Sequence, residues 1–230
     1  MVSSSSLLPS PSLLLASHAT VGCSTGYMTD LRNDWPALVR AAALTSGFAI
    51  ELSALSEDEL PGLVEYLSGT SQLPFHFVSV HGPSKRRQLP DDELAGLLNE
   101  LPCWISSIVM HPDSMHDPAA YSVLGRRLCI ENMDSRKSVG QSAEALGGYF
   151  DALPSARLCF DIAHAKAVDP SMGVGRQILS AYSARLSHVH LSSLDAAQKH
   201  VPLTRSDETL FSELLERCID VPWILEAPPA

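Results

Sequence analysis

The feature that most constrains this chain is a regular alternation of short apolar runs with amphipathic segments. Eight runs rich in β-branched or small residues recur at roughly even spacing along the 230 residues. We expect strands at Leu13–Ser17, Ala49–Leu52, Phe75–Val80, Ile105–Met110, Arg127–Ile130, Arg157–Phe160, Leu186–Val189 and Trp223–Leu225. Strands that alternate with helices imply a parallel sheet. Eight of them favour a (β/α)8 barrel, with a doubly wound open sheet as the alternative.

The segments between these runs carry helix signals. Ser56 is followed three residues later by Glu59, which is the pattern of a capping box at a helix start. Gly47 is placed to end a helix over Trp35–Ser46, because glycine readily adopts the left-handed conformation that closes a helix. Because strand and helix signals alternate along the chain, we expect a single domain over residues 1–230, with residues 1–12 as a flexible lead.

Composition narrows the class of protein. The chain has 16 Lys+Arg against 26 Asp+Glu, a formal net charge of −10, and this argues against a protein that wraps nucleic acid or coats an anionic membrane. No run approaches the roughly 20 apolar residues of a membrane span. The five cysteines are widely spaced, with no CxxC pair, so we expect a reducing, cytoplasmic environment.

Titratable side chains follow the expected strands in phase with their C-terminal ends. They are His18, Glu51, His81, His111, Glu131, Asp161 with His164, His188 with His190, and Glu226. In a parallel barrel these ends converge on one face, where active sites are built. Imidazoles and carboxylates gathered without matching cations would be costly to desolvate. Because these groups are usual ligands of divalent ions, the pattern predicts a metal site.

These residues resemble the xylose-isomerase-like TIM barrels, a superfamily that holds sugar isomerases and epimerases together with endonuclease-IV-like apurinic endonucleases. The resemblance runs from Ser17 to Pro228. Its sharpest segments are CFDIAHAKA at Cys159–Ala167, IENM at Ile130–Met133, HVHL at His188–Leu191 and LEAP at Leu225–Pro228.

The resemblance implies ligands for metal ions. Isomerases and epimerases of this superfamily usually hold one divalent ion, with ligands that match Glu131, Asp161, His190 and Glu226. The endonuclease branch holds up to three zinc ions, and its additional histidines are matched by His81, His111, His164 and His200. The segment SHATVG resembles that branch's first-strand segment at His18. We expect a divalent metal, with zinc favoured and manganese, magnesium or cobalt as alternatives.

One departure from the endonuclease pattern affects a metal position. That branch has an Asp-x-His pair after strand seven, whereas this chain has Gln198-Lys199-His200. The third ion would therefore lack one carboxylate ligand.

Two chemistries use the same residues. In a phosphoester hydrolase resembling endonuclease IV, Glu131 would bridge two zinc ions, and Glu226 with Asp161 would complete the cluster. In a single-metal sugar or sugar-phosphate isomerase or epimerase, Glu131 and Glu226 would flank the sugar as an acid/base pair. The additional histidines favour the hydrolase, because a single-metal isomerase has no evident need for them.

Half of the basic residues lie just after expected strands, on the side where we expect the active site. These are Lys85, Arg86, Arg87, Arg136, Lys137, Lys166, Lys199 and Arg205. They form either solvated loops or an electropositive mouth for a small anionic or sugar-like substrate. Our candidates for substrate binding are His18, Lys85, Arg86, Lys137, Lys166 and His188. The short loops have few aromatic side chains, which argues against long duplex nucleic acid.

The chain has four residues after Glu226. We therefore expect a compact barrel without the last helix, in which either the N-terminal segment or a second subunit covers that flank. We favour a homodimer.

Overall fold

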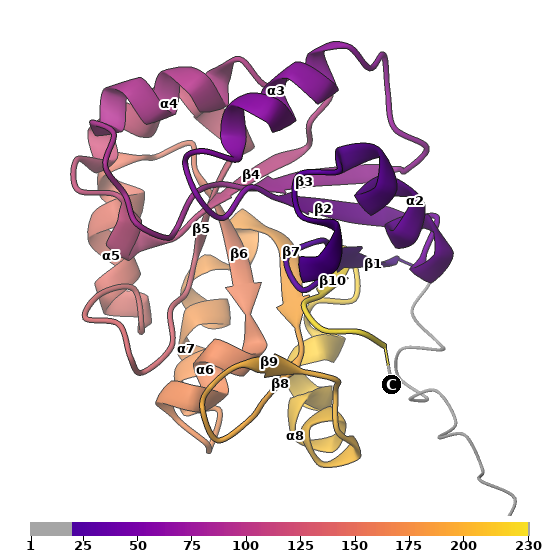
Figure 1. Ribbon diagram of the computed structural model, residues 1–230. Helices are drawn as coiled ribbons and strands as arrows, with labels where there is room; N and C mark the ends of the chain where they lie inside the picture. Colours follow the sequence, from indigo (N-terminus) through magenta and orange to yellow (C-terminus); the bar gives the residue numbers. More distant parts are fainter. Residues whose placement is uncertain (1–19, 230) are drawn as a thin grey trace, which may run out of the picture.

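The computed structural model describes residues 20–229 and shows a closed barrel of eight parallel strands (Figure 1). Around the barrel, β1 pairs with β2, each later strand follows in turn to β7, and β10 lies between β7 and β1. The strands are β1 (Val21–Ser24), β2 (Ala49–Ser53), β3 (Phe77–His81), β4 (Ser107–Met110), β5 (Leu128–Glu131), β6 (Arg157–Asp161), β7 (Leu186–Leu191) and β10 (Trp223–Leu225). The expected (β/α)8 TIM-barrel fold is confirmed.

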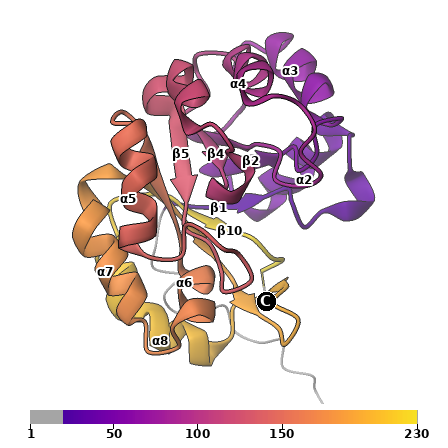
Figure 2. The same ribbon diagram turned by 90° about the vertical axis from the view of Figure 1, so that its left-hand side faces the viewer.

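Helices form a ring outside the strands (Figure 2). The α-helices are α2 (Trp35–Thr45), α3 (Leu60–Ser68), α4 (Asp91–Asn99), α5 (Ala143–Ala152), α6 (Ile162–Val168), α7 (Gly173–Tyr182) and α8 (Arg205–Glu216). Short 3-10 helices lie at η1 (Thr29–Leu31), η2 (Pro112–Ser114), η3 (Pro118–Arg127) and η4 (Ser183–Arg185). A small antiparallel hairpin, β8 (Ser193–Leu194) with β9 (His200–Val201), follows β7.

Side-chain alternation on the strands separates two interiors. One set, which includes Leu52, Val80 and Phe160, is buried in the main apolar core together with side chains of the helices. The other set points into the barrel lumen, where Val109, Cys129 and Cys159 form a separate buried cluster. The two-residue period of a strand produces this division and places every second strand-end side chain on the lumen side.

The first strand differs from the expectation. The barrel uses Val21–Ser24, while the run Leu13–Ser17 and the candidate His18 lie outside the described residues. A side chain at Gly22 would come within 2.3 Å of the Ala49 carbonyl oxygen, so glycine is required where β1 approaches β2. The more apolar run resembled a strand more closely, but pairing on both sides selects the segment that contains Gly22.

Element ends follow local chemistry. The helix α2 ends as expected, but through Ser46 in an extended conformation, and Gly47 has no positive φ. One hydrogen bond of the expected capping box forms, in which the Glu59 carboxylate accepts from the Ser56 backbone N–H. The helix α3 itself begins at Leu60, one residue after Glu59. The described residues after β10, 226–229, contain no helix. Within residues 20–229, no helix is long and apolar enough to cross a membrane.

Candidate metal centre

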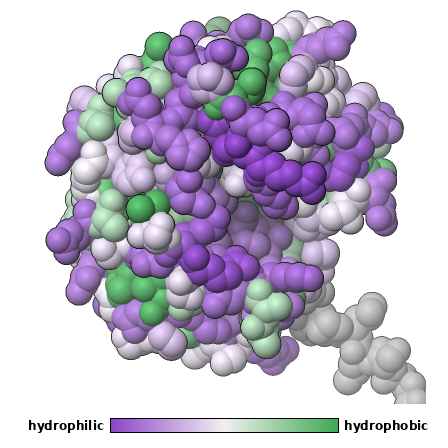
Figure 3. Space-filling view, turned by 60° about the vertical axis from the view of Figure 1, so that its left-hand side comes forward, coloured by the Kyte–Doolittle hydropathy of each residue, from purple (hydrophilic) through white to green (hydrophobic). Residues whose placement is uncertain are grey.

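Histidines and carboxylates converge where the parallel strands end. The set, called here the metal centre, comprises His81, His111, Glu131, Asp161, His164, His190, His200 and Glu226. Six of these residues come from the ends of barrel strands or directly follow one, and the other two come from α6 and β9. A cavity of about 670 Å³ opens over the centre. Figure 3 shows a hollow with a mostly hydrophilic rim on this side of the molecule.

One group of ligands joins β3, β4 and β5. The Oε2 atom of Glu131 lies 3.3 Å from Nε2 of His81 and 3.2 Å from Nε2 of His111. The two Nε2 atoms are 3.1 Å apart. Nδ1 of His81 donates to the Gly82 carbonyl oxygen at 2.9 Å, which leaves the Nε2 lone pair facing the group. Three ligand atoms are therefore placed to share one ion.

The central group contains Glu131, Asp161, His190 and Glu226. Nδ1 of His190 lies 3.3 Å from Oε1 of Glu226 and 3.6 Å from Oε2 of Glu131. The opposite ring nitrogen, Nε2, donates to the Glu51 carboxylate at 3.1 Å. This bond selects the tautomer with a free lone pair on Nδ1, directed at the three carboxylates.

The third group contains Asp161, His164 and His200. Asp161 caps α6 through a 2.6 Å bond from the His164 backbone N–H to Oδ1, and its other oxygen lies 3.4 Å from Nδ1 of His164. His200 approaches from β9, with Nδ1 3.2 Å from Oε2 of Glu226. Asp161 belongs to two groups, as does Glu131, so both carboxylates are placed to bridge neighbouring ions.

Uncompensated polar atoms indicate that the centre fits cations. Oε2 of Glu131, Oδ2 of Asp161, Nδ1 of His190 and Oε2 of Glu226 are buried and have no hydrogen-bond partner among the described residues. Leaving such groups unsatisfied costs about 1–3 kcal/mol each. Nitrogen and oxygen ligands in this arrangement match the preferences of zinc and similar divalent ions.

The pKa values show the same shortage of positive charge. Burial raises the pKa of Glu226 well above its ordinary value, and the charges of Asp161 and Glu131 raise it further. Burial also opposes ionisation of Glu131, but His111 and His190 outweigh it and hold the pKa of Glu131 below its usual range. Burial disfavours protonation of His164, yet the carboxylates of Asp161 and Glu131 raise its pKa to about 10. In the absence of metal, a proton on His164 supplies part of the missing positive charge.

Comparison with known proteins places this geometry in context. No protein-family model matches the sequence, and no curated protein matches it. Among solved structures, endonuclease IV from Thermus thermophilus has a TM-score of 0.59 and 21% sequence identity, over 92% of this chain and 93% of that chain. The chain has the TIM-barrel fold of endonuclease IV.

Two further structures share the fold. An HpcH/HpaI aldolase from Desulfitobacterium hafniense DCB-2 has a TM-score of 0.53 at 11% identity, over 95% of this chain and 91% of that chain. L-Talarate dehydratase from Polaromonas sp. JS666, solved with Mg and L-glucarate, has a TM-score of 0.51 at 14% identity, over 93% of this chain and 52% of that chain. All three are enzymes. At these sequence identities, their similarity to this chain is a similarity of the TIM-barrel fold alone.

The substrate-binding candidates are placed differently from one another. Lys85 and Lys137 line the cavity over the metal centre of the TIM barrel, and Arg86 lines an adjoining cleft. His188 is fully enclosed in the lumen below, with Nε2 3.5 Å from Oε2 of Glu51. Lys166 lines neither space, because its ammonium group forms an ion pair with Asp207 on α8.

Two carboxylates near the site are additional to the predicted ligands. Glu51, fully buried at β2, accepts from Ser79 at 2.9 Å as well as from His190. Its position at a strand end was the available sequence signal. Asp134 lies on the loop after β5, with Oδ2 3.8 Å from Nε2 of His164, and only its position three residues after Glu131 pointed to it.

Gln198, at the position that departs from the endonuclease pattern, contacts Ser135 through Nε2 at 3.2 Å. Besides Asp161 and Glu226, Asp134 is a further carboxylate near the third group. It also pairs with Arg136, whose Nε lies 3.0 Å from Oδ2.

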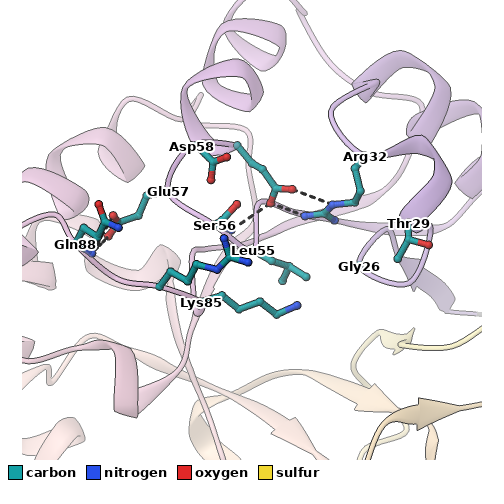
Figure 4. Close-up of a pocket in the computed structure, with 11 residues that line it drawn as sticks. Gly26, Thr29, Arg32, Leu55, Ser56, Glu57, Asp58, Lys85 and Gln88 are labelled. Carbon is teal, nitrogen blue, oxygen red and sulfur yellow. Dashed lines mark hydrogen bonds and ion pairs between the residues drawn. The ribbon is translucent and has the colours of Figure 1, made fainter.

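An adjoining cleft of about 500 Å³ extends the cavity (Figure 4). The two spaces share Gly26, Thr29, Leu55 and Lys85 as lining residues. On one side of the cleft, Arg32 is held by Glu59 through Nε at 2.9 Å. Lys85 extends beside Leu55 between the spaces and has no ion pair among the residues that the structure describes.

Proposed function

We propose that the protein is a divalent-metal-dependent hydrolase that cleaves a phosphoester in a small or single-stranded anionic substrate, with a multinuclear zinc site. The observation that carries the proposal is the sharing of Glu131 and Asp161 between adjacent ligand groups. A single-ion isomerase needs only the central group and has no role for His111 or His200. The fold shared with an endonuclease is consistent with this choice.

The ligand assignment follows the three groups. His81, His111 and Glu131 would hold one ion, and Glu131, Asp161, His190 and Glu226 the second. His164 and His200 would hold the third with Asp161, and Asp134 is near enough to replace the carboxylate absent at Gln198. When bound, such ions lower the pKa of water and neutralise charge on a phosphoryl group.

The protein's contribution is to orient the ligands before any ion arrives. Nδ1 of His164 donates to the Asn132 carbonyl oxygen at 3.0 Å, which leaves Nε2 as the free ligand atom. In the same way, the Glu51 carboxylate accepts from Nε2 of His190, and the Gly82 carbonyl oxygen accepts from Nδ1 of His81. Each bond settles which ring nitrogen keeps its lone pair, so little reorganisation is needed when a cation binds.

Cationic side chains around the cavity would bind the substrate. Lys85, Arg136, Lys137 and Lys199 all line it, although the chain as a whole is acidic. Lys137 is held by Asp113 at 2.6 Å, and Lys85 stands at the junction with the adjoining cleft. A phosphate over the metal centre would therefore meet positive charge, and the cleft has room for the rest of a small anionic molecule.

Metal stoichiometry combined with two activity assays tests the proposal. We expect two or more zinc ions per chain and hydrolysis of bis(p-nitrophenyl) phosphate or of a short single-stranded oligonucleotide with an abasic site. One manganese, magnesium or cobalt ion per chain, together with turnover of sugar phosphates, would contradict it in favour of the isomerase.

A pair of variants sharpens this test. His111→Ala should lower the bound zinc, because His111 belongs to the first group only. His116→Ala is the matched control, since His116 is exposed and belongs to none of the groups. Equal zinc content in the two variants would count against a multinuclear centre. The expected homodimer also remains a prediction, and sedimentation of a clean monomer would contradict it.

A further inference from the structure

The barrel lumen beneath the metal centre has an unusual lining. TIM barrels normally fill this space with bulky branched aliphatic side chains. Here Cys129, Cys159, His188 and Glu51 occupy it, and none of them has any exposed surface. Val109 is the apolar residue packed with the two cysteines. Such a lining needs a chemical explanation that packing alone does not supply.

Three possible ligand atoms meet at one point. The sulfur of Cys159 and ring nitrogens of His188 and His190 lie within 4.8 Å of one another. Nδ1 of His188 contacts the Ser187 hydroxyl at 3.1 Å, so Nε2 is the nitrogen left to face the lumen. It points toward Glu51, at 3.5 Å from Oε2.

Two polar atoms here remain unsatisfied although they are completely buried. Oε1 of Glu51 and Nε2 of His188 have no hydrogen-bond partner within the part of the chain that the structure describes. The other Glu51 oxygen is already used by Ser79 and His190. A free carboxylate oxygen and a free imidazole nitrogen thus belong to neighbouring, fully buried side chains, and the thiol of Cys159 lies next to the imidazole.

Because Nε2 of His190 already donates to Glu51, it is not free to bind an ion here. We propose that Cys159 and His188 bind a further divalent ion inside the barrel, separate from the metal centre, with the free Oε1 atom of Glu51 as the third ligand. A set of sulfur, nitrogen and oxygen ligands suits zinc or a similar thiophilic cation. Binding converts the Cys159 thiol to a thiolate, and the displaced proton leaves to solvent. We call this location the lumen site.

The lumen site is chemically distinct from the centre above it, whose ligand atoms are only nitrogen and oxygen. His190 stands between the two, with Nδ1 toward Glu226 and Nε2 toward Glu51. The inference does not depend on the proposed hydrolase activity, because a lumen ion would be present whether the centre hydrolyses phosphoesters or isomerises sugars.

Cobalt reports on the lumen site through its sulfur ligand. Metal-free protein is titrated with Co²⁺ under argon, and the thiolate-to-cobalt charge-transfer band in the near ultraviolet is recorded. We expect its final intensity to correspond to about one sulfur-bound Co²⁺ per chain, because Co²⁺ held by the nitrogen and oxygen ligands of the metal centre does not contribute to this band. It should disappear in Cys159→Ser and in His188→Gln. It should persist in Cys218→Ser, because Cys218 is buried in the outer core and lies apart from these ligands.

A wild-type protein without the band would overturn the proposal, as would a band that survives in Cys159→Ser. Circular dichroism shows whether each variant folds, and the wild-type titration is decisive even where a variant does not. His111→Ala should keep the band while losing zinc from the metal centre. Loss of phosphoesterase activity with the band intact would therefore refute the proposed function alone.

Discussion

Two buried clusters of charged side chains in this molecule differ in how their charge is compensated. In the first, called here the Arg87 network, Arg87 donates to Asp91 at 2.6 Å and forms an ion pair with Glu57. Tyr121 donates to the same Asp91 oxygen at 2.7 Å. In the metal centre, by contrast, carboxylate oxygens such as Oε2 of Glu131 have no donor among residues 20–229.

The difference appears in the carboxyl pKa values. Burial opposes ionisation of Asp91, but bonds from the Asp117 backbone N–H, Tyr121 and Arg87 outweigh it and lower its pKa. At Glu226 burial is not outweighed, and the charges of Asp161 and Glu131 add to the rise in its pKa. A buried network that includes its own cation is compensated within the chain, whereas one that lacks a cation is a candidate for an ion supplied from outside.

The largest expected effect is at the shared ligand. Glu131→Gln should remove two ions at once, since Glu131 belongs to two ligand groups. We expect zinc content to fall by about two ions and phosphoesterase activity by more than about 100-fold, the upper end of the loss seen when even a supporting residue is removed. Elemental analysis and initial rates measure both, and zinc content equal to wild type would contradict the bridging role.

The matched change in the Arg87 network should affect stability instead. Asp91→Asn leaves Arg87 with Glu57 as its remaining carboxylate partner. We expect a loss of about 3 kcal/mol in the free energy of unfolding, the lower end for breaking a buried ion pair. Urea unfolding measures this, while zinc per folded chain should stay unchanged. If Asp91→Asn loses zinc but not stability, the Arg87 network has a role in metal binding and the distinction between the two clusters is wrong.

Per ion, metal removal is expected to have a slightly smaller effect than Asp91→Asn. Each bound zinc ion, at 100 times its dissociation constant, should stabilise the fold by about 2.7 kcal/mol. For a chain of this length, this corresponds to a melting temperature about 5 to 10 °C higher. Thermal unfolding with and without chelator measures the shift. The Asp91→Asn variant should have a lower melting temperature but the same shift when chelator is added. A variant without this shift would mean that the Arg87 network and the metal centre are coupled.

Removal of one cation from the cavity should change substrate affinity by a smaller free energy than the changes above. Lys137→Ala removes a partly exposed cation from the cavity, so we expect KM to rise about fivefold, in line with about 1 kcal/mol for such a charge, with kcat unchanged. Lys166→Ala is the matched control, because Lys166 lies outside the cavity. Steady-state kinetics on the phosphoester substrate measures both variants, and an equal change in KM would argue against a specific role for Lys137.

The smallest effect is the acid response of the Arg87 network. The folded-state pKa of Asp91 lies below its ordinary value, so its stabilising contribution is present above about pH 4, the pKa in the unfolded chain, and is lost as pH falls through the folded pKa. Urea unfolding from pH 5 down to pH 3 should therefore show a shallower decline in Asp91→Asn than in the wild type. If the free energy of unfolding declines equally in the two proteins, groups other than Asp91 cause the acid sensitivity.

Local patterns predicted most of the barrel because apolar strand runs and their two-residue alternation are properties of the sequence itself. The ranges for β2 to β7 and β10 overlap the expected strands. The exception is β1, because VGCS carries a weak local signal and is selected by its pairing with β2 and β10. The convergence of candidate ligands such as Glu131 and Asp161 could be predicted because they end strands in phase.

Partners distant in sequence could not be predicted in this way. Arg87 and Lys166 were both grouped with a basic mouth, yet Arg87 belongs to the buried network and Lys166 pairs with Asp207 on α8. Asp134 joins the surroundings of His164 only through the fold of the loop after β5.

The sequence by itself determined the type of barrel and the residue types at the C-terminal ends of its strands, because strand periodicity and strand-end positions are local. Tertiary structure decided which buried charges are neutralised by other side chains and which have no partner among the described residues. It also decided that His188 lies inside the lumen with Cys159, whereas His190 serves the metal centre. The reason is physical: compensation of a buried charge depends on distances across the barrel, and the order of residues does not specify those distances.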